Sequence, residues 1–183
     1  MPRLWPALLL GAAAFAAAPA RAEIKLEGVR WEAGEGLPAT RKFREVEALP
    51  LRNGVLKARV RAKVAVRNAS PVSVEGILLR YCVSALLAPG RPRAVGSTEG
   101  SWTVPFLVEE KRIPRIGAQR TIETSVDPTV SVRLYVARMA RAGYRVEELR
   151  LAIMVEPRPE VAKGSPGEQG DIQTIESIVK VKP

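Results

Sequence analysis

Apolar and polar residues alternate strictly between Val55 and Arg67, the clearest pattern in the chain. One face would carry six small or branched apolar residues: Leu56, Ala58, Val60, Ala62, Val64 and Val66. The other face would carry five cations: Lys57, Arg59, Arg61, Lys63 and Arg67. A period of two residues over this length is typical of an antiparallel strand with one buried face and is not a helical pattern. The segment therefore predicts a strand whose exposed face is basic.

The next segment turns at Asn68–Pro71 and returns as a strand over Val72–Val83. Its apolar positions change parity: Val72 and Val74 come before the change, and Ile77, Leu79, Tyr81 and Val83 after it. Gly76 stands at the change. A bulge there would place both sets in the core and leave Arg80 and Cys82 outside, whereas without a bulge both faces of the strand are covered.

Short apolar runs separated by turn residues predict the remaining strands at 24–31, 42–49, 102–109, 121–126, 149–155 and 172–181. One turn before the strand at 121–126 is expected from Ile113–Pro114 together with Gly117–Ala118. The stretches 88–101 and 157–170 are rich in Pro and Gly and predict loops, the second of them flexible. Because contacts with partners concentrate on loops, these two stretches are candidate contact surfaces.

One helix is predicted at about residues 128–142. Asp127 supplies an N-cap acceptor, Pro128 suits the first turn, and Gly143 suits the position after the helix. The apolar stripe in between consists of Val132, Tyr135, Val136, Met139 and Ala140. Seven or eight short strands with one helical crossover predict an all-β fold, an antiparallel sandwich of two sheets.

Residues 1–22 resemble a secretory signal peptide. Arg3 is followed by an apolar run over Leu4–Ala18, and Ala20–Ala22 forms an A-x-A cleavage site. A transmembrane anchor would need about 20 apolar residues, and this run is shorter. We therefore expect a signal peptide at 1–22, a single β-sandwich domain at 23–183, no transmembrane anchor, and a periplasmic or secreted bacterial protein.

The residue content limits the chemistry that the chain can perform. The sequence contains no His and one Cys, which removes His-based nucleophile pairs and an intramolecular disulfide. Cys82 is either a small buried residue or the site of an intermolecular disulfide. The paired carboxylates Glu109–Glu110 and Glu147–Glu148 would point to opposite faces of strands, so neither pair converges on one atom. The sequence therefore predicts no enzyme, no cofactor and no metal site.

The formal net charge of the chain is +10, which favours anionic partners. The five cations on the predicted strand face are a candidate site for an anionic envelope polysaccharide or lipid headgroups. Nucleic acid is not expected, because aromatic residues make up 5% of the chain and none lies among these cations. The alternative is a solvated sheet face on which the cations pair with Glu45, Glu47 or Glu123 of neighbouring strands.

Two segments, Val60–Val83 and Arg112–Gln119, resemble parts of immunoglobulin-like accessory domains of exported bacterial proteins. The resemblance implies a sandwich of binding, adhesion or assembly type, although the predicted helix and the absence of a Cys pair depart from it. The leading hypothesis is an exported, non-catalytic interaction or assembly module of the bacterial cell envelope, which binds another envelope protein at exposed sheet edges. The alternative is a binder of anionic polymer or a membrane surface.

Overall fold

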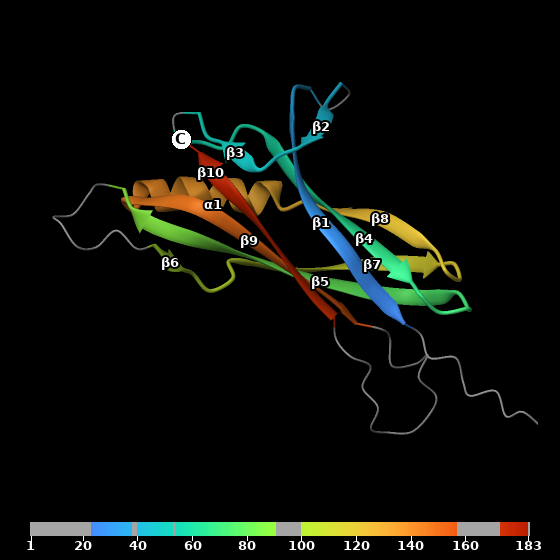
Figure 1. Cartoon of the computed structure of the whole chain (residues 1–183). Helices are drawn as coiled ribbons and strands as arrows, with labels where there is room; N and C mark the ends of the chain where they lie inside the picture. Colours follow the sequence, from blue (N-terminus) through green and yellow to red (C-terminus); the bar gives the residue numbers. More distant parts are fainter. Residues whose placement is uncertain (1–22, 38–39, 53, 91–99, 157–172, 183) are drawn as a thin grey trace, which may run out of the picture.

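The computed structural model describes residues 23–37, 40–52, 54–90, 100–156 and 173–182. The predicted signal peptide, most of the loop predicted at 88–101 and all of the loop predicted at 157–170 lie outside these residues. The described chain forms two facing sheets and one helix (Figure 1). The prediction of an all-β, two-sheet sandwich with one short helix is thereby confirmed.

Each sheet takes strands from distant parts of the chain. The first sheet has the order β2 (Lys42–Glu45), β1 (Ile24–Glu35), β4 (Arg59–Asn68), β8 (Thr121–Val126). The second has the order β3 (Ala48–Pro50), β10 (Gln173–Lys182), β9 (Tyr144–Glu156), β5 (Val74–Pro89), β6 (Ser101–Trp102), and β7 (Leu107–Ile116) also pairs with β5. Apolar residues of both sheets and of the helix form one buried cluster between them.

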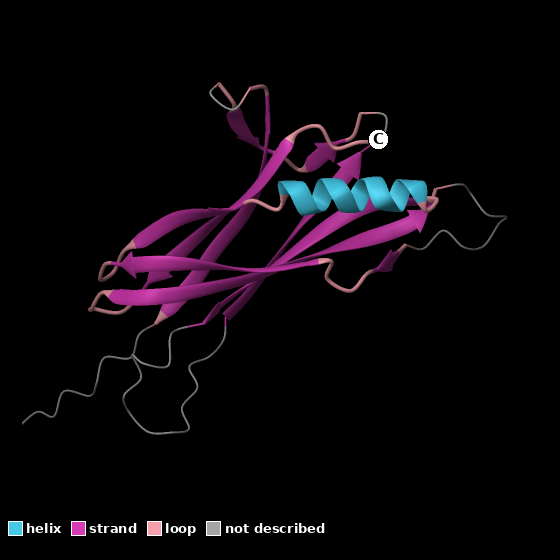
Figure 2. Cartoon of the chain, turned by 180° about the vertical axis from the view of Figure 1, so that it is seen from behind, coloured by secondary structure: helices cyan, strands magenta, loops and turns pink. Residues whose placement is uncertain are grey.

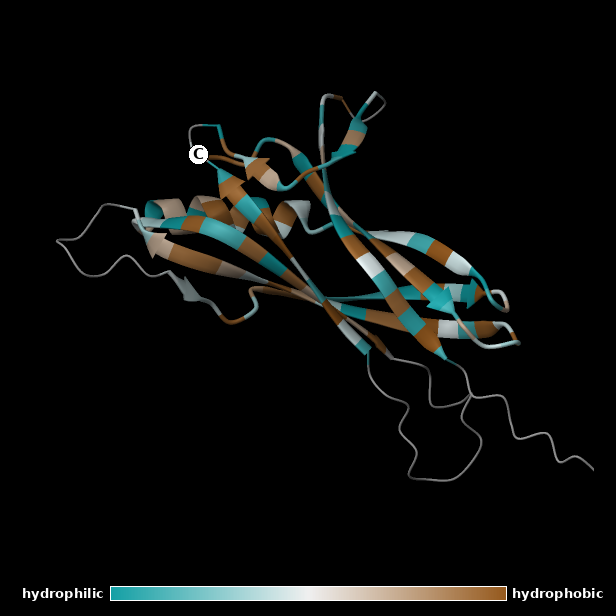
Figure 3. Ribbon diagram, in the orientation of Figure 1, coloured by the Kyte–Doolittle hydropathy of each residue, from teal (hydrophilic) through white to brown (hydrophobic). Residues whose placement is uncertain are grey.

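The alternating segment forms β4, at the middle of the first sheet. All six of its predicted core residues are at most 2% exposed, and apolar and polar residues alternate along the ribbon (Figure 3). The strand begins at Arg59 and not at Val55, because backbone carbonyl groups before Arg59 accept hydrogen bonds from the side chain of Arg133 and not from a neighbouring strand. Arg133 donates to the carbonyl oxygens of Leu56 at 2.9 Å and Lys57 at 3.1 Å.

The turn at Asn68–Pro71 does not join two paired strands. β4 pairs with β1 and β8, whereas β5 belongs to the other sheet, so the turn is an arch that crosses the sandwich. The expected order of strand, turn and strand is present, but the turn connects the two sheets and not two paired strands. The buried side chain of Asn68 stabilises this arch, because its amide oxygen accepts a hydrogen bond from the backbone N–H of Ser70 at 3.0 Å.

Gly76 does change the parity of β5, but without an extra residue. Its φ is +66°, and the register with β7 is the same on both sides: Glu75 lies opposite Arg115, and Ile77 opposite Ile113. Val74 and Ile77 are both buried as expected, while Val72 is exposed. Of the predicted turn, Gly117 and Ala118 do lie in the connection between β7 and β8, but its start at Ile113–Pro114 is wrong, because both of these residues lie within β7. As an outer strand of its sheet, β7 tolerates a proline.

The strand predicted at Lys42–Leu49 is two strands in different sheets. The chain crosses between them at Val46 and Glu47: the N–H of Val46 donates to Trp31 of β1, and the carbonyl of Glu47 accepts from Lys180 of β10. β3 then pairs with β10 in parallel, so the expectation of purely antiparallel sheets is also wrong. The alternation of apolar and polar residues continues through such a crossing, because each sheet buries one of its faces against the same core. The sequence pattern therefore does not reveal where the chain passes from one sheet to the other.

The strand predicted at Trp102–Glu109 is also interrupted. β6 ends at Trp102 and β7 begins at Leu107, with Pro105 between them. On either side of this proline, the N–H groups of Thr103 and Phe106 still donate to Ala85 and Val83 of β5. Because proline has no N–H to donate, the ladder is broken at this point. The predicted strands at 24–31, 121–126, 149–155 and 172–181 are present, and several are longer than expected.

The helix α1 (Thr129–Arg141) lies within the predicted range 128–142, and its C-terminal end is as expected. At its start the N-cap is Pro128 and not Asp127, although the carboxylate of Asp127 accepts a hydrogen bond from the N–H of Thr129. Gly143 has a φ of +82°, as expected for the residue after the C-cap. Val132 and Val136 are buried, and the ring of Tyr135 stacks on Phe106 with 3.9 Å between centroids. The helix packs on β9 and the start of β4, beside the first sheet (Figure 2). It thereby covers the part of the second sheet that the first sheet leaves open.

Candidate functional site

The outer face of the first sheet carries the five cations singled out from the sequence, and four of them have carboxylate partners. Arg61 donates to Glu32 at 2.6 Å and Lys63 to Glu123 at 2.9 Å. Arg59 bonds to Asp127 at 2.8 Å from Nε, and Arg67 to Glu27 at 3.3 Å. Of Glu45, Glu47 and Glu123, the partners considered from sequence, Glu123 forms an ion pair with one of these cations. The cations and their partners alternate across β1, β4 and β8, so most of this face is neutralised.

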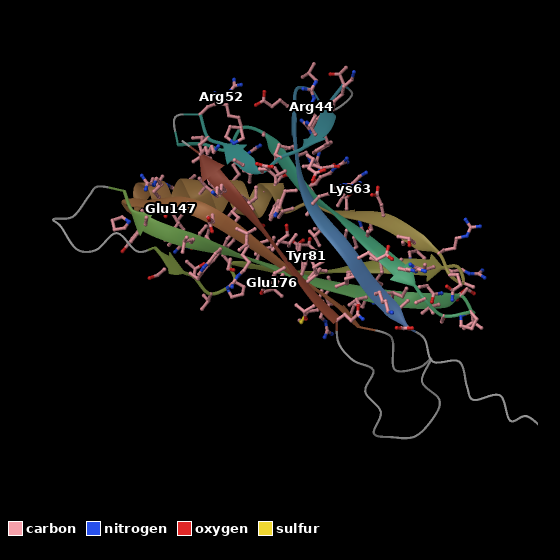
Figure 4. All side chains as sticks on the ribbon, viewed as in Figure 1. Arg44, Arg52, Lys63, Tyr81, Glu147 and Glu176 are labelled. Atoms are coloured by element: carbon pink, nitrogen blue, oxygen red, sulfur yellow. The ribbon has the colours of Figure 1, made fainter. Side chains whose placement is uncertain are left out.

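Glu123 lies at the centre of this ion-pair network. Its carboxylate accepts from Lys63, which is labelled in Figure 4, and from Arg30 of β1. The hydrogen bond from Lys63 is the main reason that the pKa of Glu123 lies below its ordinary value, and the charge of Arg30 adds to it. Glu123 is therefore ionised at neutral pH. A negative charge in the middle of the face makes a continuous basic stripe along β4 impossible.

Positive charge in excess collects at the end of this face nearest to α1. Within the described chain, Lys57 forms no ion pair, and two further cations lie near it: Arg41 from the β1–β2 connection and Arg133 from α1. Together with Arg59 these side chains line a pocket of about 510 Å³. Sequence reasoning missed Arg41 and Arg133, because they approach Lys57 only through the tertiary fold.

Among the residues that the structure describes, Asp127 is the one carboxylate that lines this pocket. It bonds to the Arg59 guanidinium, and its other oxygen accepts from the backbone N–H of Thr129 at 3.2 Å. Burial alone would raise the pKa of Asp127, but the hydrogen bonds from Thr129 and Arg59 outweigh burial, so the pKa lies below its ordinary value. The group is ionised at neutral pH and offsets the charge of Arg59.

We expect the variant Asp127→Asn to be less stable than the wild type at neutral pH, because Arg59 loses its partner. A carboxyl whose pKa is lowered by folding stabilises the fold above its unfolded pKa, ordinarily 3.8, and this contribution is lost as the pH falls through the folded pKa. The difference in unfolding free energy should therefore shrink between about pH 7 and about pH 2.5. Urea unfolding of both proteins across this range measures it. Glu75→Gln, which breaks an exposed ion pair with Arg115, is the control. If the difference in unfolding free energy between Asp127→Asn and the wild type grows as the pH falls, the lowered pKa of Asp127 is contradicted.

The carboxylates of Glu109 and Glu110 point to opposite faces of β7, as predicted. Glu110 bonds to Arg80 at 2.8 Å on the outer face. Glu109 accepts from the hydroxyl of buried Tyr81, which is labelled in Figure 4, on the inner side. Burial chiefly, then the hydrogen bond to Glu109 and the charges of Glu109 and Asp127, raise the pKa of Tyr81 well above its ordinary range. Tyr81 is therefore protonated, and its hydroxyl donates a hydrogen bond to the carboxylate of Glu109 at the border of the core.

Cys82 lies on the outer face of the second sheet and is half-buried. Its neighbours across the strands are Ala152 of β9 and Val108 of β7, and Val108 is 71% exposed. The thiol is thus neither in the core nor fully exposed. A second hollow of about 750 Å³ lies at the C-terminal end of α1, lined mostly by apolar and glycine residues such as Val136 and Gly143.

The outermost strand β8 presents an unpaired backbone edge. The Thr129 hydroxyl accepts from the N–H of Val60 and donates to its carbonyl, and the N–H of Asn68 donates to the carbonyl of Arg120. The backbone N–H and C=O groups of the even-numbered residues of β4 therefore point towards β8. In β8 the even-numbered residues lie opposite the even-numbered residues of β4. Because successive residues of a strand direct their backbone groups to opposite sides, those of Thr121, Glu123 and Ser125 point away from β4. Within the described part of the chain, only one of these groups has a partner: the carbonyl of Ser125 accepts from Lys111 of β7.

The residue content of β8 does not protect this edge. Its sequence, TIETSV, contains no Lys, Arg, Pro or Gly, and its single charge, Glu123, is held by two cations. The outer strand β7 contains Lys111, Arg112, Pro114 and Arg115, all of which oppose edge-to-edge pairing. The outer strands β2, β3 and β6 have four, three and two residues. β8 is therefore the most open edge among the described strands.

Comparison with known proteins adds little. No family model and no curated protein matches the chain. Solved structures similar to it include a β-glucosidase involved in saponin metabolism from intestinal bacteria, a β-D-glucoside glucohydrolase from Trichoderma reesei and a β-glucosidase from Listeria innocua. Their identities are 10%, 10% and 12%, each with a TM-score of 0.34. The matches cover 86%, 87% and 90% of this chain but 16%, 19% and 16% of those chains. The chain thus spans less than a fifth of each.

Two further properties concern only the residues that the structure describes. None of their helices has the length and apolar character to cross a membrane. No group of three or more His, Cys, Asp or Glu side chains among them is placed to hold a metal ion.

Proposed function

We propose that this protein is an exported, non-catalytic interaction module of the bacterial cell envelope, which binds an extended segment of another envelope protein at β8. The open edge of this strand is the observation that carries the proposal. An incoming strand would bond to the backbone groups of Thr121 and Glu123 and to the N–H of Ser125, whose carbonyl already accepts from Lys111. The signal-peptide pattern at 1–22 supports export, and we propose a periplasmic or secreted location on that basis.

The side chains beside this edge define the expected partner. On the inner side, Ile122 is half-buried and would be covered by an apolar residue of the added strand. On the outer side, Thr121 and Glu123 would lie beside polar or basic residues of that strand. The partner should therefore present an extended segment that alternates apolar and polar residues.

Membership of the immunoglobulin-like class is part of this proposal. The two facing sheets and the arch at Asn68–Pro71 support it, while α1 and the parallel pairing of β3 with β10 depart from it. Binding of an anionic polymer along β4 has less support, because carboxylates partner Arg59, Arg61, Lys63 and Arg67.

The substitution Ser125→Pro tests the β8 edge directly. It removes an N–H that points away from β4, so the ladder inside the first sheet stays intact while an added strand loses a bond and meets the proline ring. Ser125→Ala is the matched control, because it also removes the hydroxyl but keeps the N–H. We expect crosslinking in intact cells to recover one partner with wild type and Ser125→Ala, and about tenfold less with Ser125→Pro, which corresponds to about 1.4 kcal/mol.

A second measurement keeps this test decisive if Ser125→Pro fails to fold. A photo-crosslinking residue at position 121 should capture the same partner, whereas one at Leu134, which is 65% exposed on α1, should not. Equal capture from both positions, or recovery of no partner from the wild type, would contradict the proposal.

A further inference from the structure

Four basic side chains from three separate segments converge in the 510 Å³ pocket beside the start of α1. They are Arg41, Lys57, Arg59 and Arg133, and with Asp127 as the one lining carboxylate their formal net charge is +3. The rest of the outer face pairs its cations with carboxylates. This pocket is therefore the place on that face where positive charge is not neutralised.

Arg133 fixes the position of Lys57. Its guanidinium donates to the carbonyl oxygens of Leu56 at 2.9 Å and Lys57 at 3.1 Å, which ties the segment before β4 to α1. The side chain of Lys57 is exposed at the pocket, and within the described chain it forms no hydrogen bond or ion pair. Its ammonium group is thus available to a ligand.

Arg41 reaches the pocket because Gly34 has no side chain. A Cβ on Gly34 would lie 2.9 Å from Cγ of Arg41, so the arginine stem lies directly over the glycine. One terminal nitrogen of Arg41 donates to the carbonyl of Gly36 at 2.9 Å. Its Nε is buried and has no hydrogen-bond partner in the described chain. Arg41 lines the pocket and adds its positive charge there.

We propose that this pocket binds a phosphate group, either as the free ion or as a monoester. A doubly charged oxyanion with several acceptor oxygens matches a site of net charge +3 in which guanidinium and ammonium donors meet. The pocket is larger than a phosphate ion, which leaves room for the molecule to which the phosphate is esterified. The site uses side chains that the β8 edge does not use, so it is independent of strand addition.

Isothermal titration calorimetry of the purified protein with inorganic phosphate, at neutral pH and low ionic strength, tests this proposal. We expect saturable binding that Lys57→Ala weakens about tenfold and Arg41→Ala by at least as much. Lys63→Ala is the matched control, because it removes a cation from the same strand face outside the pocket, and its affinity should change less than twofold. Asp127→Asn should bind phosphate more tightly, because it removes the one negative charge of the pocket.

Three results would overturn the proposal: no saturable binding, equal binding of acetate at the same ionic strength, or equal weakening by Lys57→Ala and Lys63→Ala. Glycerol 3-phosphate and vesicles of phosphatidylcholine with phosphatidic acid distinguish the source of the group. Tighter binding of the ester than of the free ion identifies an esterified phosphate, and Lys57-dependent binding to the vesicles identifies a lipid headgroup. Ser125→Pro should bind phosphate like the wild type, so failure of the strand-addition proposal is separable from failure of this one.

Discussion

Asn68→Ala should lower the free energy of unfolding by about 2 to 4 kcal/mol, the largest single effect that we expect. Asn68 is fully buried at the arch between the two sheets. Its amide nitrogen donates to the carbonyl oxygens of Val72 at 2.7 Å, Gly117 at 3.0 Å and Ile116 at 3.3 Å. Its oxygen accepts from the N–H of Ser70. Alanine would leave these backbone groups buried without partners.

This side chain joins two connections that are distant in sequence. The arch after β4 and the turn between β7 and β8 are both bonded to Asn68, and the turn is also tied back by the N–H of Gln119, which donates to Ser70 at 3.1 Å. Because each connection runs between the sheets, their junction helps to hold the sandwich closed. Loss of Asn68 should therefore destabilise both sheets together and not only the local turn.

Thermal and urea unfolding measure this effect. A loss of about 2 to 4 kcal/mol corresponds to a fall in Tm of roughly 5 to 15 °C for a domain of this size. The near-isosteric Asn68→Asp should be at least as harmful, because it replaces the donor by a carboxylate that faces three carbonyl oxygens. Gln119→Ala, at an exposed residue of the same junction, is the control and should cost less than about 1 kcal/mol. A loss below about 1 kcal/mol for Asn68→Ala would refute this role.

Thr129→Val should cost about 2 to 3 kcal/mol, although the two side chains have nearly the same shape. The hydroxyl of Thr129 accepts from the N–H of Val60 at 2.8 Å and donates to its carbonyl at 2.6 Å. By the register of β4 with β8, Val60 would lie opposite Pro128, which has no N–H. The threonine hydroxyl therefore replaces the missing rung of the ladder, where the chain leaves β8 and enters α1.

Thr129→Ser is the matched control for this substitution. It keeps the hydroxyl and removes a methyl group, so its loss should stay below about 1 kcal/mol. Equal destabilisation by Val and Ser would show that packing, and not the pair of hydrogen bonds, determines the stability at this position. Amide exchange offers a second measurement, because the N–H of Val60 should lose protection in Thr129→Val and keep it in Thr129→Ser.

Local patterns failed at two places: a crossing between the sheets and a proline inside a strand. Val46 and Glu47 carry the chain from the first sheet to the second without any break in the apolar pattern, so the sequence predicts one strand where there are two. Ile113–Pro114 has the residue types of a turn but lies inside β7, where the pairing with β5 holds it in a strand. In both cases the neighbouring strand decides, and neighbours are not encoded in a short window of sequence.

The candidate sites show the same limit. Sequence placed Lys57, Arg59, Arg61, Lys63 and Arg67 on one face, and the structure agrees. Which of these charges remain unpaired depends on β1 and β8, which supply Glu32, Glu27 and Glu123 from distant segments. Arg41 and Arg133 join Lys57 for the same reason, and no spacing in the sequence indicates it.

The sequence by itself determined most of the strands and the helix, because a period of two residues, a 3.6-residue stripe and turn residues act through local geometry and the burial of one face. It also determined which face of β4 is buried and which is charged. Tertiary structure alone decided the sheet to which each strand belongs, the strand left unpaired at the edge, and the cations left without a carboxylate. These outcomes depend on contacts between residues far apart in the chain, which form only when the two sheets close on their common core.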